Sequence, residues 1–126
     1  MTKRVLLVED EPNIVVSLRY LLTRAGFQVD VEDNGSEALK ALLANPPDVA
    51  ILDVMLPEMN GFEILEALRA DERGAQVPVL MLTAKGQRED RERAMAAGAD
   101  RFVTKPFSNA ELVAAVRELA GEAVTE

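Results

Sequence analysis

The 126-residue sequence contains no cysteine, no histidine and no tryptophan, and it has a single tyrosine. Without cysteine the chain has no disulfide, no thiolate metal site and no cysteine nucleophile, which fits a reducing compartment. Without histidine it has no Ser-His-Asp triad and no ordinary zinc site, and it cannot itself be a phosphohistidine donor.

Long apolar runs are also missing, since none approaches the ~20 residues of a membrane span. The Val5–Val8 run is too short for a signal peptide and leads directly into acids. The chain is acidic, with 22 acids against 14 bases and a net charge of −8. Nucleic acid repels such a chain unless its bases gather on one face, so we expect no direct nucleic-acid binding. The sequence predicts a cytoplasmic globular domain that uses no membrane.

Five short apolar runs alternate with five helical patterns. The predicted strands are Arg4–Val8, a short one within Phe27–Glu32, Val49–Asp53, Val79–Leu82 and Arg101–Thr104. The predicted helices begin near Pro12, Asn34, Gly61, Gln87 and Ser108. Such alternation predicts an α/β domain with a doubly wound, five-stranded parallel sheet and helices on both faces. We assign residues 1–120 to this domain and residues 121–126 to a C-terminal tail or the start of a linker.

Helix starts carry local signals. Asn34 with Glu37, and Ser108 with Glu111, have the spacing of a capping box, in which each residue bonds the other's backbone amide. Gly26 is placed to end the first helix in a left-handed conformation. The residues Thr83 to Gly86 are predicted to form a loop.

Polar side chains follow the predicted strands where these end. They are Glu9 and Asp10, Asp53, Thr83, and Lys105. Because the carboxyl ends of parallel strands meet at one edge of a sheet, where α/β proteins bind ligands, we expect these side chains to converge. Taken alone, Asp53 could equally well end a strand and cap a turn.

Three carboxylates in one pocket need a cation, because two of them about 4.5 Å apart repel by roughly 4 kcal/mol at an effective dielectric near 20. One lysine supplies too little positive charge to balance three carboxylates. A hard divalent ion such as Mg²⁺ fits, since it takes oxygen ligands and commonly binds carboxylates together with a phosphate. An aspartate can then act as a nucleophile toward phosphorus. Asp53 is the favoured nucleophile because it ends the central strand.

The segments LLVEDEP, ILDVMLPEMNGFE, VLMLTAK and GADRFVTKPF closely resemble the CheY-like receiver domain of two-component response regulators. The resemblance extends from Arg4 to about Leu119. It implies a flavodoxin/CheY-like fold with strand order 2-1-3-4-5. It also implies that Asp53 accepts a phosphoryl group from a sensor histidine kinase or a phosphotransfer protein. The chain would then be a signalling switch and not an enzyme with a separate substrate.

The resemblance implies a Mg²⁺ site, in which Mn²⁺ can substitute. Asp10 and Asp53 would bind the ion through their side chains, Glu9 through a water molecule, and Met55 through its backbone carbonyl. Taken alone, Met55 could be simple core filler.

The resemblance also implies roles around the phosphoryl group. Lys105 would pair with Asp53 and then with the phosphate, Thr83 would hydrogen-bond a phosphoryl oxygen, and Lys105–Pro106 would be a cis peptide. Taken alone, Lys105 is more often an exposed lysine and Thr83 a turn residue. Bulk at Met55 and Lys85 predicts slow loss of the phosphoryl group, because it screens attacking water.

In this family the signal leaves through the face of the fourth helix, the fifth strand and the last helix, toward an output partner or an effector domain. Thr83 and Phe102 would form the switch, although Phe102 could also be a plain core aromatic.

The chain resembles the OmpR/PhoB branch only partly on that face. Arg91 and Glu111 match charged positions of that branch's dimer interface. Arg101 stands where an acid is usual and Ala115 where an arginine is usual. We therefore expect either a monomer or a phosphorylation-dependent dimer.

Three other protein classes fit less well. A flavodoxin-like FMN carrier needs a hydroxyl- and glycine-bearing loop after the first strand, where this chain has the acids Glu9 to Glu11. An aspartyl-phosphate phosphatase needs a second aspartate where Met55 stands, and a lid domain. A Toprim-type enzyme needs Asp-x-Asp and a basic surface.

Overall fold

The computed structural model describes residues 2–83 and 88–121, in which five strands and five helices alternate. The strands are β1 Arg4–Val8, β2 Gln28–Glu32, β3 Val49–Asp53, β4 Val79–Thr83 and β5 Arg101–Thr104. The helices are α1 Pro12–Arg24, α2 Gly35–Ala44, α3 Gly61–Ala70, α4 Arg88–Ala96 and α5 Asn109–Leu119. All four strand pairings are parallel and the order is β2-β1-β3-β4-β5, which confirms the predicted fold.

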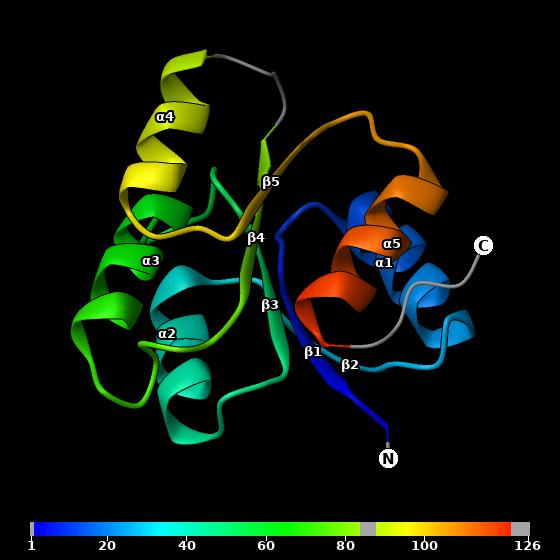
Figure 1. Cartoon of the computed structure of the whole chain (residues 1–126), viewed down its shortest axis with the longest axis horizontal. Helices are drawn as coiled ribbons and strands as arrows, with labels where there is room; N and C mark the ends of the chain where they lie inside the picture. The colour runs from blue at the N-terminus through cyan, green and yellow to red at the C-terminus, as the bar shows by residue number, and fades with distance from the viewer. Residues whose placement is uncertain (1, 84–87, 122–126) are drawn as a thin grey trace.

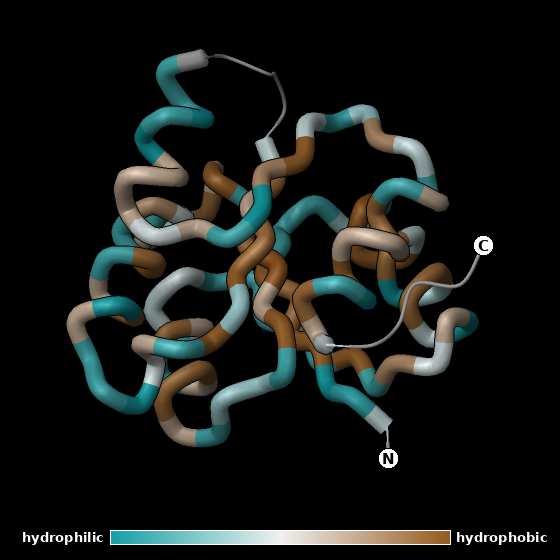
Figure 2. Tube along the Cα trace, viewed as in Figure 1, coloured by the Kyte–Doolittle hydropathy of each residue, from teal (hydrophilic) through white to brown (hydrophobic). Residues whose placement is uncertain are grey.

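The sheet separates two layers of helices, with α1 and α5 on one face and α2, α3 and α4 on the other (Figure 1). Alternate side chains of each strand enter one layer or the other, so β3 and β4 are buried along their whole length. This double burial explains why both strands are continuous apolar runs in the sequence. Figure 2 shows the apolar residues concentrated along the central strands.

Local capping signals set the helix starts. The Asn34 and Ser108 side chains each accept a hydrogen bond at 3.0 Å from the backbone amide three residues later. The capping boxes predicted at Asn34 and Ser108 are therefore only half formed, since among the described contacts Glu37 and Glu111 do not bond back to the cap amides; the complete box is at Asn60 and Glu63, a pair that the sequence analysis did not identify. Gly26 has φ +100, which confirms its predicted left-handed role.

One boundary differs from the prediction. Thr83 is the last residue of β4 and not part of a loop. The reason is that the strand ladder continues by one step: the Lys105 amide donates to the Thr83 carbonyl at 2.7 Å. Thr83 is consequently held on the sheet, where a β-branched residue packs well.

Helix α4 is the most polar of the described helices, as the hydrophilic colouring in Figure 2 shows. Ala94 of this helix is fully buried. The Arg93 guanidinium also lies over the Phe62 ring of α3, 4.2 Å from the ring centre. Little apolar area therefore holds α4 against the sheet.

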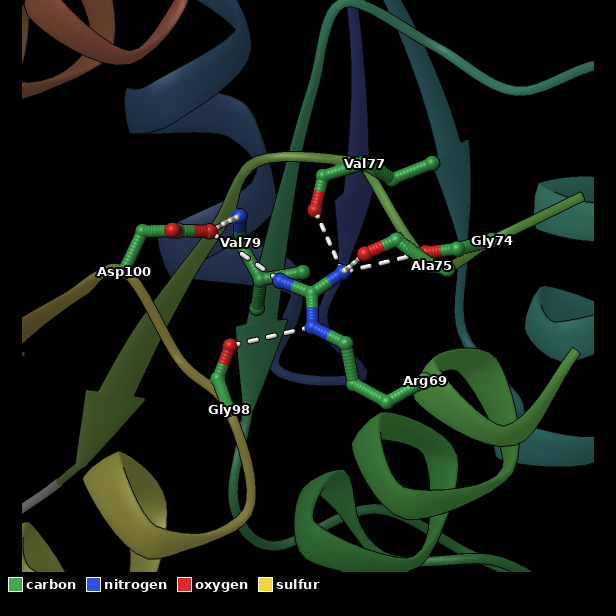
Figure 3. Close-up of polar contacts among 7 residues, drawn as sticks. All are labelled: Arg69, Gly74, Ala75, Val77, Val79, Gly98 and Asp100. Carbon is green, nitrogen blue, oxygen red and sulfur yellow. Dashed lines mark hydrogen bonds and ion pairs between the residues drawn. The ribbon is translucent and has the colours of Figure 1, made fainter. Parts of the chain in front are cut away.

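A single arginine ties the ends of α3, α4 and β4 together (Figure 3). Arg69 donates through Nε to the Gly98 carbonyl at 3.0 Å and through one guanidinium nitrogen to the Val77 carbonyl at 2.7 Å. The other guanidinium nitrogen pairs with Asp100 at 3.0 Å, and Asp100 in turn accepts from the Val79 amide at 2.8 Å. We call this arrangement the Arg69 clamp. It lies at the edge of the sheet where the strands begin.

No helix within residues 2–83 and 88–121 is long and apolar enough to cross a membrane.

Candidate functional site

Four strand ends meet at the carboxyl edge of the sheet. Glu9 directly follows β1 and Lys105 directly follows β5, while Asp53 and Thr83 are the last residues of β3 and β4. The parallel pairing sets Asp53 beside Leu82 and Thr83 beside Thr104, so the four ends finish at nearly the same level. Topology alone thus brings together residues that are far apart in the sequence.

The three predicted carboxylates form one cluster. Glu9, Asp10 and Asp53 each offer an oxygen, and these oxygens lie within 4.8 Å of one another. Glu9 and Asp53 are buried, whereas Asp10 is exposed at the mouth of the cluster. An all-oxygen donor set of this charge suits a hard divalent cation such as Mg²⁺, which keeps part of its water shell.

Lys105 is the cation that the chain itself supplies to this cluster. Its Nζ lies 3.0 Å from a Glu9 oxygen and 3.3 Å from Asp53 Oδ2. The Lys105–Pro106 peptide bond is cis. One ammonium faces three carboxylates, so the cluster keeps an excess of negative charge that a metal ion could neutralise.

The pKa of Glu9 reflects its burial first and its neighbours second. Burial, together with the neighbouring Asp53 carboxyl, raises the pKa of Glu9 from 4.5 to about 7, although Lys105 opposes the change. For Lys105, burial lowers the pKa, but the hydrogen bond and charge of Glu9 and the charge of Asp53 outweigh it and raise the pKa. The Lys105 amine therefore stays charged, whereas Glu9 releases its proton less readily than a free glutamate does.

The loop after β3 borders the site. The Met55 amide donates to Asp53 Oδ1 at 3.4 Å, while its side chain is 73% exposed and is not core filler. At the far end of the loop the backbone passes very close to Asp53: a Cβ on Gly61 would lie 2.4 Å from the Asp53 carbonyl oxygen. Only glycine allows this approach.

The two predicted switch residues lie on neighbouring strands. Thr83 is 4% exposed at the end of β4. Phe102, on β5, is partly buried and packs against the core beneath α2, α3 and α4. Lys85 lies outside the described residues.

The charges on the face formed by α4, β5 and α5 are partly paired within the molecule. Arg101 forms an ion pair with Glu118 at 2.7 Å. Asp100 belongs to the Arg69 clamp. Ala115 is buried.

Two residues near the site were missed by the sequence analysis. Asn34, the N-cap of α2, and Gly35, its first residue, contact the loop after β3. The sequence marks Asn34 only as a helix cap, and no local pattern shows that this helix start approaches a loop more than twenty residues away. Their position becomes evident only in three dimensions.

Comparison with known proteins gives a consistent result. A family model described as the response regulator receiver domain matches residues 5–117. The chain is 42% identical to the alkaline phosphatase synthesis transcriptional regulatory protein PhoP of Bacillus subtilis, over 94% of this chain and 49% of that protein. It is also 42% identical to the phosphate regulon transcriptional regulatory protein PhoB of Rhizobium meliloti, over 100% of this chain and 56% of that protein. The chain thus spans about half the length of these relatives.

Solved structures agree with the sequence relatives. A putative response regulator from Chloroflexus aurantiacus superposes with a TM-score of 0.92 at 32% identity, covering 97% of this chain and 100% of that one. The receiver domain of a sensor histidine kinase from Pseudomonas aeruginosa superposes with a TM-score of 0.89 at 30% identity, again over 97% and 100%. That structure holds a magnesium ion in its active-site cleft.

Proposed function

The chain belongs to the response regulator receiver family of two-component systems, and from that membership we propose that Asp53 accepts a phosphoryl group from the phosphohistidine of a sensor histidine kinase or phosphotransfer protein. The observation that carries this proposal is the convergence of Asp53 with Glu9, Asp10 and Lys105 at one sheet edge. The signalling module would act on its own aspartate and on no separate substrate.

A Mg²⁺ ion, or Mn²⁺ in its place, would be held by Asp10 and Asp53, by Glu9 through water, and by the Met55 carbonyl. The donor chemistry supports this set, because every group offers a hard oxygen. When bound, the ion supplies positive charge to the oxygens of the transferring group.

The residues of the chain then perform the transfer. An Asp53 oxygen forms a bond to phosphorus while the bond from phosphorus to the donor's imidazole nitrogen breaks, and that nitrogen takes a proton from water. Lys105, already 3.3 Å from Asp53, moves its contact to the phosphoryl oxygens. Thr83 donates its hydroxyl hydrogen to another of these oxygens.

A donor protein has to approach the carboxyl edge of the sheet. A groove of about 500 Å³ opens there between α1 and the segment after β5, and Ile14, Lys105 and Phe107 are among its lining residues. We assign this groove to the phosphohistidine-bearing partner, because it places the donor next to the Lys105 contact with Asp53.

The output would leave through the face of α4, β5 and α5, with Thr83 and Phe102 as the switch. Support comes from the polar, lightly packed α4 and from a 260 Å³ pocket beside Phe102. Because the relatives are transcriptional regulators about twice as long, we infer that the output partner is an effector domain or protein in the cytoplasm. The domain itself would act as a monomer or a phosphorylation-dependent dimer and would not bind nucleic acid or membrane.

Intact-mass measurement tests the proposal. The protein is incubated with Mg²⁺ and acetyl phosphate or phosphoramidate, and a gain of one phosphoryl group is expected. Asp53→Asn should abolish the gain. Asp48→Asn is the matched control, because Asp48 is another carboxylate beside β3 that instead accepts from the Arg4 amide.

The proposal fails if no mass is gained or if the Asp53→Asn variant still gains it. Release of phosphate from added phosphoesters would instead favour the phosphatase class.

A further inference from the structure

The loop between β3 and α3, residues 54–60, contacts the start of α2 at three successive residues, Pro57, Glu58 and Met59. The Gly35 amide donates to the Pro57 carbonyl at 3.2 Å. The Asn34 side-chain amide donates to the Glu58 carboxylate. The Gly35 Cα packs directly on the Met59 backbone, because a Cβ at Gly35 would lie 1.9 Å from the Met59 carbonyl oxygen. We call these contacts the Asn34–Gly35 brace.

The brace holds a loop whose conformation is not favoured by its own sequence. Glu58 has φ 68, a left-handed conformation that non-glycine residues adopt infrequently. The ends of the loop are fixed separately, by the Gly61 amide on the Val54 carbonyl at 2.9 Å and by the Asn60 cap. Between these ends, Leu56 and Met59 pack against the core and the Met59 amide donates to the Pro57 carbonyl at 2.8 Å, and the brace adds hydrogen bonds from a neighbouring element at Pro57 and Glu58.

We propose that Asn34 and Gly35 are positioning residues of the metal site, which act by fixing the loop that carries the Met55 carbonyl. This inference rests on the proposed function, in which that carbonyl is a Mg²⁺ ligand. Mg²⁺ requires oxygen ligands at ~2.0–2.1 Å in near-octahedral geometry, whereas Ca²⁺ accepts longer and more variable distances. A loop that is free to shift should therefore lose Mg²⁺ affinity more than Ca²⁺ affinity.

Gly35→Ala isolates the contact with Met59. Gly35 is the first residue of α2 and does not have a positive φ, so alanine suits its backbone. The remaining effect is the overlap with the Met59 backbone, which forces the loop and the start of α2 apart.

Asn34→Ser isolates the contact with Glu58. Serine retains an oxygen that accepts from the Glu37 amide and is as good a helix cap as asparagine. It lacks the amide donor that reaches Glu58. Ser36→Ala, one residue farther along α2, is the control that leaves the brace intact.

Calorimetric titration of each protein with Mg²⁺ and with Ca²⁺ measures the effect, and urea unfolding without metal shows that each variant is folded. For Gly35→Ala we expect the Mg²⁺ dissociation constant to rise on the order of tenfold, the scale seen when outer contacts of metal ligands are removed. The Ca²⁺ constant should rise less. Asn34→Ser should raise both dissociation constants by a smaller factor. Ser36→Ala should have the same dissociation constants as the wild type.

Equal losses of Mg²⁺ and Ca²⁺ affinity, or wild-type constants in both brace variants, would overturn the inference while leaving the proposed function intact. If Gly35→Ala does not fold, the Mg²⁺ and Ca²⁺ dissociation constants of Asn34→Ser decide the question by the same criterion. A wild-type protein that binds no Mg²⁺ would instead refute the metal site itself, and the brace with it.

Discussion

The Lys105 ammonium lies 3.3 Å from Asp53 Oδ2, and the two side chains are only 14% and 7% exposed. The same ammonium therefore offsets the charge of Asp53 and lies beside the carboxylate cluster that would hold a metal ion. Lys105 and a divalent ion repel each other across this site, since both are positive.

Replacing Lys105 by methionine should separate these two effects. We expect Lys105→Met to bind Mg²⁺ more tightly than the wild type, by several-fold, because the competing positive charge is gone. We also expect slower formation of the aspartyl phosphate, because no ammonium stabilises the transferring group. Calorimetry measures the first effect and time-resolved intact mass the second.

Lys40→Met is the matched control for this prediction. It removes the same charge from an exposed lysine of α2 that pairs with Glu37 at 3.3 Å. An equal gain in Mg²⁺ affinity in both variants would mean that net charge, and not the position of Lys105, is responsible.

The raised pKa of Glu9 predicts a pH dependence of stability in metal-free protein. The folded chain holds the Glu9 proton up to about pH 7, whereas the unfolded chain releases it near 4.5. The folded state thus binds more protons between these values, so the free energy of unfolding decreases as pH rises through the window. The loss should be on the order of 3 kcal/mol.

Urea denaturation in the presence of a chelator, at pH values from 4 to about 8, measures this window. Glu9→Gln should abolish the decrease in the free energy of unfolding across this window, while the pH dependence contributed by the other acids remains. A pH profile that is the same in both proteins would show that Glu9 ionises normally in the fold.

Much of the fold could be predicted because its signals are local. Buried parallel strands are continuous apolar runs, and caps such as Ser108 mark helix starts within three residues. Convergence of Glu9, Asp10, Asp53 and Lys105 followed from topology, since residues that end parallel strands meet at one edge. The roles assigned to these residues stay predictions.

The contacts that could not be predicted join segments distant in the sequence through backbone atoms. The Arg69 clamp uses the carbonyls of Val77 and Gly98, and every residue type has a carbonyl. The Asn34–Gly35 brace depends on the absence of a side chain at Gly35, which in the sequence indicates only a turn or a helix start. Neither contact leaves a pattern that a single sequence can reveal.

The Arg69 clamp leads to a prediction about stability. Arg69→Met keeps the apolar stem of the side chain but removes the guanidinium, so the carbonyls of Val77 and Gly98 lose their charged donor and Asp100 keeps only the Val79 amide. We expect the free energy of unfolding to fall by about 1 to 3 kcal/mol, because the partly buried carbonyls lose a charged donor, whereas the pair with Asp100 is solvent-screened and contributes little. The phosphorylation rate at Asp53 should be unchanged, since the clamp lies at the opposite edge of the sheet. Urea unfolding and intact mass measure the two quantities.

Arg73→Met serves as the control for the clamp. Arg73 is exposed and pairs locally with Asp71 at 2.9 Å, so its loss should leave the urea midpoint where it is. The clamp would have no special role if both variants lowered the midpoint equally.

The lifetime of the aspartyl phosphate should depend on Met55. Its side chain is 73% exposed beside Asp53, where its bulk can screen the phosphoryl group from attacking water. Met55→Asn replaces that bulk with a shorter amide that can hydrogen-bond water, so the phosphoryl group should be lost faster. The decay of the phosphorylated mass after removal of the donor measures the rate. Met95→Asn makes the same change on α4, where methionine is 47% exposed, and should leave the decay rate unaltered. Decay in Met55→Asn that is as slow as in the wild type would mean that water reaches phosphorus by a path that Met55 does not cover.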